Sequence, residues 1–124
     1  NLNTKNIGPY PFALSRSRVT EEDARVEVLT PEHKLLNHPN KITQADFDGW
    51  VQERGLYFTE KWDERYTPLF SMNDAGEQPL KGSTIYSPYG KGHYIYTSLS
   101  FFRQLPAGNA GALRLLCNFI SIGK

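Results

Sequence analysis

The chain has 124 residues, a length that suits one domain and lets it bury about two-thirds of the surface of its unfolded form. Its 14 Lys and Arg residues nearly balance its 13 Asp and Glu residues, so the basic surface typical of nucleic-acid binding is not expected. No apolar run reaches the roughly 18 residues that a membrane span needs, and a single cysteine excludes an internal disulfide.

The first third of the chain is predicted to be mostly irregular. Residues 1–11 should form an extended lead-in, because a glycine and two prolines interrupt regular structure there. Residues 20–23 resemble a helix start, but no apolar periodicity follows, so we expect a turn. Residues 25–30 alternate between apolar and charged side chains, which predicts a half-buried strand. Residues 31–40 should form a loop that turns two leucines inward.

Short elements are expected in the middle of the chain. One helical turn is predicted over residues 43–47, with Thr43 as its cap. Strands are predicted over residues 49–58, with an interruption at a glycine, and over residues 66–72. The sequence Asn-Asp-Ala-Gly at residues 73–76 predicts a turn.

The clearest local signal is a β-hairpin at residues 83–98. Two runs rich in β-forming residues flank a Pro-Tyr-Gly-Lys-Gly connection, whose glycines can adopt positive φ angles. A helix is predicted over residues 110–122, packed on a sheet and ending at Gly123. The apolar stripe that should be buried comprises Ala110, Leu113, Leu116, Cys117 and Ile120, and it is widened by Leu115 and Phe119.

Reactive side chains are few. Cys117 is the only possible thiol nucleophile, and its apolar neighbours predict an inert core residue. His33 and His38 have a spacing found in zinc sites, but they lie in a proline-containing loop without cysteine, so we predict loop histidines and no metal. His93 should flank the hairpin. The sequence therefore predicts no catalytic residue and no cofactor.

Carboxylates gather at residues 21–23, 46–48 and 60–64. A pair that faced one cleft could perform acid–base chemistry, but sequence alone does not show such facing. The loop at residues 89–92 resembles a phosphate-binding loop, yet a strand rather than a helix follows it, which favours the hairpin. Arginines near the carboxylates favour ordinary solvated charge pairs; they are Arg16, Arg18, Arg25, Arg54 and Arg65.

A span rich in aromatic and charged residues is the strongest candidate for ligand binding. Its members could stack on a sugar ring or contact a protein partner, because amphipathic aromatic side chains are used in both ways. The alternative reading places Trp50 and Phe58 in the core and Trp62 as a lid over it. The predicted ligand-binding residues are Trp50, Tyr57, Trp62 and Tyr66.

Seven segments carry a family resemblance: residues 8–12, 14–16, 18–24, 39–42, 46–55, 89–92 and 101–108. Together they resemble the C-terminal region of bacterial PIG-L/LmbE-type deacetylase-related proteins, where a class I glutamine-amidotransferase-like domain follows the deacetylase domain. The resemblance runs from about residue 8 to residue 122, and its long block at residues 46–55 is fairly specific, whereas the Gly-Lys-Gly hairpin is generic. At residues 109–111 the chain lacks an expected proline, which should lengthen or loosen the start of the helix.

The resemblance implies an α/β (or α+β) fold, with a partial flavodoxin-like, amidotransferase-like sheet and a C-terminal helix packed on it. Residues 1–124 would be a single domain, the C-terminal piece of a longer extracytoplasmic bacterial protein. The parent would bind zinc and act on N-acetylated sugars or similar amides. Its His-Pro-Asp-Asp type motif and the amidotransferase cysteine do not occur here, so no catalytic residue is carried over.

Three functions follow as hypotheses. The first is a non-catalytic accessory domain that helps a deacetylase-like parent recognise carbohydrate or assemble. The second is a small hydrolase that uses the carboxylates or the two loop histidines. The third is a dimerisation module, because half of a flavodoxin-like sheet would leave open edges and bare apolar faces. Expected partners are carbohydrate, the parent deacetylase domain and a second copy, with no nucleic acid and no membrane span.

Overall fold

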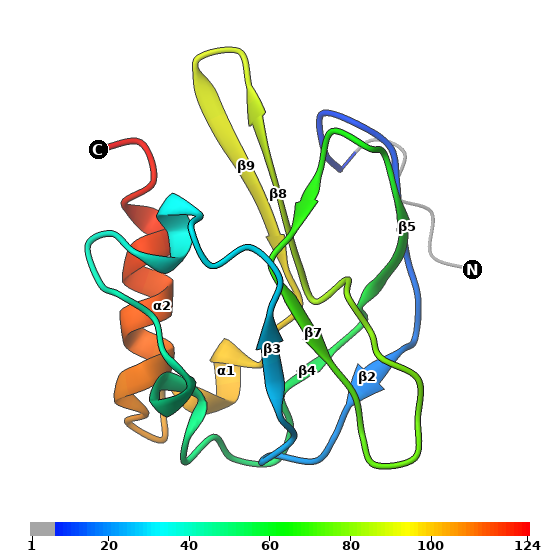
Figure 1. Ribbon diagram of the computed structural model, residues 1–124, viewed down its shortest axis with the longest axis vertical. Coiled ribbons are helices and arrows are strands. Elements are labelled where there is room, and N and C mark those ends of the chain that lie inside the picture. The colour runs from blue at the N-terminus through cyan, green and yellow to red at the C-terminus, as the bar shows by residue number, and fades with distance from the viewer. Residues whose placement is uncertain (1–6) are drawn as a thin grey trace.

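The computed structural model describes residues 7–124 and combines nine short strands with four short helices. Helix α2 lies on one side of the molecule, and the strands fill the centre and the opposite side (Figure 1). The helices are η1 (Lys34–Leu36), η2 (Gln44–Phe47), α1 (Phe101–Gln104) and α2 (Ala110–Ile120). The strands are β1 (Phe12–Leu14), β2 (Arg18–Val19), β3 (Val26–Val28), β4 (Gly55–Leu56), β5 (Thr59–Trp62), β6 (Thr67–Pro68), β7 (Phe70–Met72), β8 (Thr84–Tyr89) and β9 (Gly92–Thr97).

Two chain segments far apart in sequence form one long antiparallel pair, which we call the N-terminal ribbon: residues 12–19 against residues 55–62. Strand β1 pairs with β5, and β2 pairs with β4. Between these pairs Ser15 N–H donates to the Phe58 carbonyl at 3.0 Å, and Phe58 N–H donates to the Ser17 carbonyl at 3.0 Å. The ribbon is therefore continuous, with a bulge between Ala13 and Leu14.

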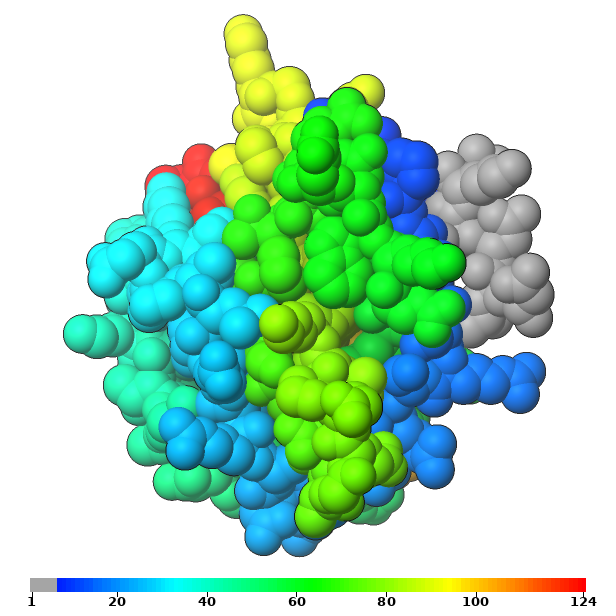
Figure 2. Space-filling model, turned by 45° about the vertical axis from the view of Figure 1, so that its right-hand side comes forward, coloured from blue at the N-terminus to red at the C-terminus, as the bar shows by residue number. Residues whose placement is uncertain are grey.

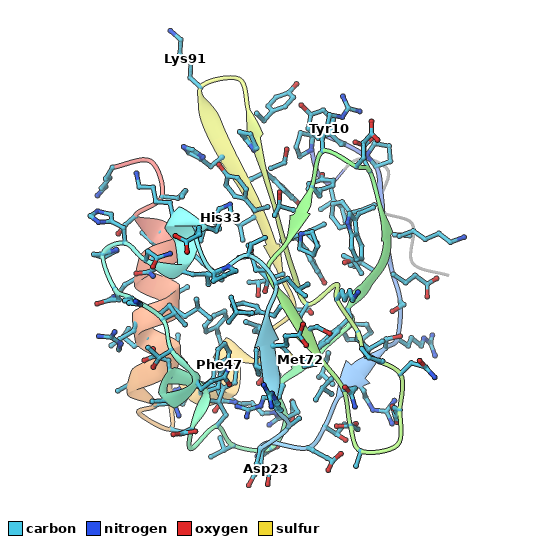
Figure 3. All side chains as sticks on the ribbon, in the orientation of Figure 1. Tyr10, Asp23, His33, Phe47, Met72 and Lys91 are labelled. Carbon is cyan, nitrogen blue, oxygen red and sulfur yellow. The ribbon has the colours of Figure 1, made fainter. Side chains whose placement is uncertain are left out.

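The remaining strands pair as β3 with β7 and as the three-stranded order β6-β8-β9. Every strand pair among residues 7–124 is antiparallel. The mixed strand-and-helix class is confirmed, whereas the flavodoxin-like sheet is not, because that sheet is mainly parallel. The predicted hairpin at residues 83–98 is confirmed: β8 and β9 meet at a tight turn with Gly90 at φ 56° and Lys91 at its tip (Figure 3).

Other local predictions have mixed outcomes. Strand β3, the inward leucines of η1 and the helical turn after Thr43 are confirmed, as are the turns at residues 20–23 and 73–76. The predicted strand at residues 49–58 is wrong for most of its length, because Gln52 and Tyr57 have φ angles of 69° and 60° that no strand accepts. The predicted strand at residues 66–72 is divided into β6 and β7. The lead-in lies partly outside the described residues.

Helix α2 is confirmed, but its predicted buried face is correct only at Leu115 and Phe119. Leu113 and Ile120 are 53% and 69% exposed, and Cys117 is half-buried. The expected loosening at residues 109–111 is not found, because the Asn109 side chain caps the helix by accepting from Ala112 N–H at 2.9 Å. The face that packs inward comprises Ala112, Leu115, Asn118 and Phe119.

Two hydrophobic clusters hold these elements together. The larger lies between α2, the loops that carry η1 and η2, and strands β3 and β7, with Phe47 and Met72 in its interior (Figure 3). The smaller lies between the N-terminal ribbon and the β8–β9 hairpin, where Phe12, Tyr66 and Ile85 are buried. Phe12 and Tyr66 meet edge to face with ring centroids 5.6 Å apart, an arrangement that aromatic pairs favour. None of the described helices is long and apolar enough to cross a membrane.

Candidate functional site

Two of the four predicted binding aromatics are buried. Trp50 is 2% exposed, and its Nε1–H donates to the Asp46 carbonyl at 2.9 Å. Tyr66 is 3% exposed, and its hydroxyl donates to the Tyr10 carbonyl at 2.8 Å. A sugar ring has no access to either side chain in this structure. Both rings instead stabilise the two hydrophobic clusters.

Trp62 is half-buried at one end of the N-terminal ribbon. Its ring packs against the smaller hydrophobic cluster, as a lid would. It also borders a concavity of about 290 Å³ together with Pro11, Ala13 and Asp63. The Asp63 carboxylate there is already held by the Arg65 guanidinium at 2.8 Å, which brings the pKa of Asp63 down to about 2.

Tyr57 is the most exposed of the four, at 52%. It follows β4, and its φ angle of 60° lies in the left-handed region that bulky side chains rarely adopt. The Tyr96 hydroxyl fixes this conformation by donating to the Tyr57 carbonyl at 2.9 Å. Burial raises the pKa of Tyr96 to about 12, so this hydroxyl keeps its proton at physiological pH. The Tyr57 backbone is thus held while its side chain reaches solvent.

A second concavity, of about 300 Å³, opens beside Tyr57 and is lined by Arg16, Arg18 and Leu56. The ribbon brings these residues together, because Arg18 pairs with Leu56 in the β2–β4 register. Figure 2 shows the face on which the segment around residues 10–20 (blue) adjoins the segments around residues 55–70 (green). We call this second concavity, which is lined by Arg16, Arg18, Leu56 and Tyr57, the Tyr57 concavity.

The two arginines of the Tyr57 concavity are exposed, and within residues 7–124 neither forms an ion pair. Arg18 contributes to the electrostatics of Asp74. Burial acts to raise the pKa of Asp74, but hydrogen bonds from Glu21 and Thr20 and the positive charge of Arg18 hold it below its usual range. The predicted solvated charge pairs therefore do not form at these two arginines, although Arg65 does pair with Asp63.

Arg54, another of the arginines predicted to form solvated charge pairs, has a different environment. Arg54 is buried, and its guanidinium donates to the Ala24 carbonyl at 2.7 Å and to the Phe47 carbonyl. Burial lowers the pKa of Arg54. Its charge lies 5.9 Å from the Trp50 ring centroid, so Arg54 joins the core rather than a solvated pair.

The three histidines lie on different elements and have different partners. His33 caps η1, because its Nδ1 accepts from Leu35 N–H at 3.1 Å, and burial lowers the pKa of His33. His38 is exposed in the following loop. His93 lies on β9, where its Nδ1 is 2.7 Å from the Tyr86 hydroxyl. In the part of the chain that the structure describes, no group of three or more His, Cys, Asp or Glu could hold a metal ion.

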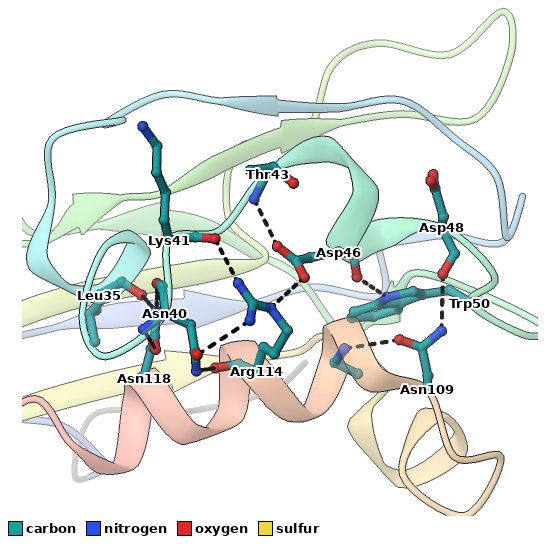
Figure 4. A network of polar contacts seen from close by, with 11 residues as sticks. Leu35, Asn40, Lys41, Thr43, Asp46, Asp48, Trp50, Asn109, Arg114 and Asn118 are labelled. Atoms are coloured by element: carbon teal, nitrogen blue, oxygen red, sulfur yellow. Dashed lines mark hydrogen bonds and ion pairs between the residues drawn. The ribbon is translucent and has the colours of Figure 1, made fainter.

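Several carboxylates accept hydrogen bonds from backbone N–H groups or pair with an arginine, and in this way they hold structural elements together. Asp46 accepts from Thr43 N–H at 2.8 Å and pairs with Arg114 at 2.9 Å, which ties η2 to α2 (Figure 4). Glu22 accepts from Gln52 N–H at 2.7 Å. The concavities beside Trp62 and Tyr57 contain a single carboxylate between them, that of Asp63. The paired carboxylates that a hydrolase needs are not gathered in either.

Comparison of the chain with protein-family models, with curated proteins and with solved structures finds no match. Function is therefore inferred from the geometry of the two concavities. Sequence reasoning found their aromatic side chains but missed Arg16 and Arg18 as site residues. An Arg-x-Arg pattern with no acidic neighbour between residues 14 and 20 was the available signal.

Proposed function

We propose that this chain is a non-catalytic accessory domain of a PIG-L/LmbE deacetylase-like parent and that it binds carbohydrate at the Tyr57 concavity. The observation that carries the proposal is the exposed Tyr57 ring, presented on a strained but fixed backbone. Strain of this kind persists only where the surroundings hold it, and it is concentrated at functional sites. The proposal also draws on the sequence resemblance, which implies a parent that acts on N-acetylated sugars.

The chemistry of the concavity suits a sugar. The apolar C–H face of a pyranose packs on an aromatic ring, while its hydroxyl groups need hydrogen-bond partners at the rim. Tyr57 and Leu56 supply the apolar surface, and the guanidinium groups of Arg16 and Arg18 supply donors. Because the ribbon holds all four residues, binding requires no rearrangement of the fold.

Tyr57→Ala is expected to abolish glycan binding while leaving the fold intact, because the side chain is exposed and only its backbone carbonyl bonds to Tyr96. Binding to a glycan array and the thermal midpoint measure the two effects. Tyr89→Ala is the matched control, since Tyr89 is another exposed tyrosine, at the end of β8. Trp62→Ala should weaken binding less than Tyr57→Ala does. An array signal that Tyr57→Ala leaves unchanged would refute the site.

The parental part of the proposal has a separate test. Reading the complete gene product should reveal a zinc-binding His-Pro-Asp-Asp type motif before this domain. The same proposal places the parent outside the cytoplasm. Under it, any flavodoxin-like sheet would be formed together with residues of the parent that precede this domain. A complete gene product without a deacetylase motif would separate the carbohydrate site from this parent.

A second candidate function, assembly with a second copy of the chain, is favoured by the outer face of α2. Leu113, Leu116, Cys117 and Ile120 recur there at the i, i+3, i+4, i+7 spacing of helix–helix contacts, and both ends of this stripe are exposed. A self-complementary helix pair about a two-fold axis would cover it.

Light scattering after size-exclusion chromatography is expected to show a dimer under this second candidate, and Leu113→Gln with Ile120→Gln should convert it to a monomer. The physical reason is the loss of apolar area from an interface centred on α2. Phe102→Gln, which changes an exposed apolar residue of α1, is the control. A monomer at high protein concentration excludes the assembly role and leaves the carbohydrate proposal unaffected.

A further inference from the structure

We infer that the Tyr57 concavity selects sugars that carry an oxyanion, either a carboxylate or a sulfate group, and that Arg16 and Arg18 bind this group. The inference rests on the proposed carbohydrate function and names its ligand class. It follows from the charge of the concavity, which a neutral sugar does not need.

The first step is the availability of the two guanidinium groups. Arg16 and Arg18 both line the concavity, and within residues 7–124 no carboxylate pairs with either. Both guanidinium groups are positively charged and line the same concavity, so both attract an anion that enters it. Two arginines that line one concavity, and that pair with no carboxylate among residues 7–124, therefore offer a binding site to an anionic ligand.

The second step is that the acidic group acting on Arg18 is fixed elsewhere. The Asp74 carboxylate accepts hydrogen bonds from Thr20 N–H and Glu21 N–H at 2.9 Å and 2.8 Å through Oδ1. Its Oδ2 accepts from the Thr20 hydroxyl at 2.9 Å. Asp74 is consequently committed to capping the turn after β2 and does not fold over the concavity to neutralise it.

The third step is the match between the lining groups and the ligand. A guanidinium group offers a planar fork of donors that binds carboxylate and similar oxyanions through two parallel hydrogen bonds. Tyr57 and Leu56 form an apolar wall beside this fork. A sugar acid presents both features on one ring, with a C–H face for the wall and an oxyanion for the arginines.

Nucleic acid, the other common polyanion, fits less well. Its binding depends on many phosphate contacts along an extended basic surface. The whole chain has only one more basic than acidic residue, and the charge of this concavity comes from two side chains. A single oxyanion on a short sugar segment matches that scale.

The test compares the parent domain with the double variant Arg16→Gln, Arg18→Gln on a glycan array that carries uronate, sialylated, sulfated and neutral oligosaccharides. Calorimetric titration then uses the strongest acidic oligosaccharide and its neutral counterpart of equal length. We expect the acidic sugar to bind at least tenfold more tightly than the neutral one. The double variant should remove this preference, and added salt should weaken it. The uronate and sulfate arms identify which oxyanion is used.

Arg25→Gln is the matched control, because Arg25 is also exposed but does not line the concavity. It should leave both affinities unchanged. Equal binding of acidic and neutral sugars, or an acidic preference that survives in the double variant, overturns the inference and leaves the carbohydrate function standing. Absence of binding to any sugar on the array, with the fold verified by circular dichroism, rejects the carbohydrate function itself. Binding of oligonucleotide in place of acidic sugar also overturns the inference.

Discussion

Gly111→Ala is expected to destabilise the domain by roughly 3 kcal/mol, the upper part of the range for overpacking. In an isolated helix the same change would stabilise by about 1 kcal/mol, because alanine has the higher helix propensity. The sign reverses here because a β-carbon at Gly111 would overlap the carbonyl of Asp46 and lie 2.5 Å from the Asp46 Cα. Helix α2 and η2 pack at backbone contact, and only glycine permits this distance.

The Asp46 backbone has little freedom to yield. Its carbonyl accepts from Trp50 Nε1–H at 2.9 Å, and its carboxylate binds Thr43 N–H and the Arg114 guanidinium (Figure 4). Moving α2 outward to admit the methyl group would therefore stretch the contacts of a buried tryptophan and of an ion pair together. The cost is shared among several groups, none of which can relax alone.

Denaturant unfolding followed by tryptophan fluorescence measures the effect of Gly111→Ala. Gly123→Ala is the matched control, because its β-carbon would meet only the His93 ring at 3.8 Å, an ordinary contact. That change should alter the free energy of unfolding by less than about 0.5 kcal/mol. A Gly111→Ala variant as stable as the parent would show that α2 and η2 are not held at the close distance described.

The elements that could be predicted from sequence are those whose cause is local. Turn chemistry defines the β8–β9 hairpin, and alternation of apolar and charged residues defines β3. The N-terminal ribbon has no comparable local signal, because β2 and β4 contain two residues each. Its register depends on pairings such as Ser15 with Phe58, 43 residues apart in sequence. Long-range pairing of short strands is decided by packing that a single sequence does not display.

Two blocks of the family resemblance, at residues 46–55 and 101–108, contact one another. Gln104, fully buried, accepts from Val51 N–H at 2.8 Å and donates to the Val51 carbonyl at 2.9 Å. Arg103 pairs with Glu53 at 2.7 Å. Residues 101–108 thus supply hydrogen-bond partners for the Val51 backbone within the irregular segment at residues 49–54. The residues of these blocks serve the fold, and the Tyr57 concavity lies outside both of them.

The candidate site was only half predictable. Aromatic residues are common in cores and in binding surfaces alike, so composition did not separate buried Trp50 and Tyr66 from the accessible Trp62 and Tyr57. The left-handed backbone of Tyr57 has no sequence signal, since glycine or asparagine normally marks such positions. Arg16 and Arg18 are recognisable as site residues only because the ribbon places them beside Tyr57 and no carboxylate among the described residues forms an ion pair with them.

Asn118→Leu is expected to destabilise the domain by roughly 3–5 kcal/mol, although it makes the buried face of α2 more apolar. Asn118 is 0% exposed. Its Nδ2 donates to the carbonyls of Leu35 and Asn40 at 2.9 Å and 2.7 Å, and its Oδ1 accepts from Asn40 N–H at 2.9 Å. Leucine would leave three backbone groups without these partners, at about 1–3 kcal/mol for each that stays buried.

This variant tests why most of the apolar stripe predicted to be buried on α2 is exposed or half-buried. An apolar stripe identifies a core only if burial of hydrocarbon dominates, whereas here the loop at residues 35–40 presents backbone polar groups to the helix. Denaturant unfolding measures the loss, and hydrogen exchange should show that Asn40 N–H loses protection. Leu113→Asn, the converse change on the exposed face, should cost less than about 1 kcal/mol. A stabilised Asn118→Leu variant would mean that the loop satisfies its own polar groups and that apolar burial alone orients the helix.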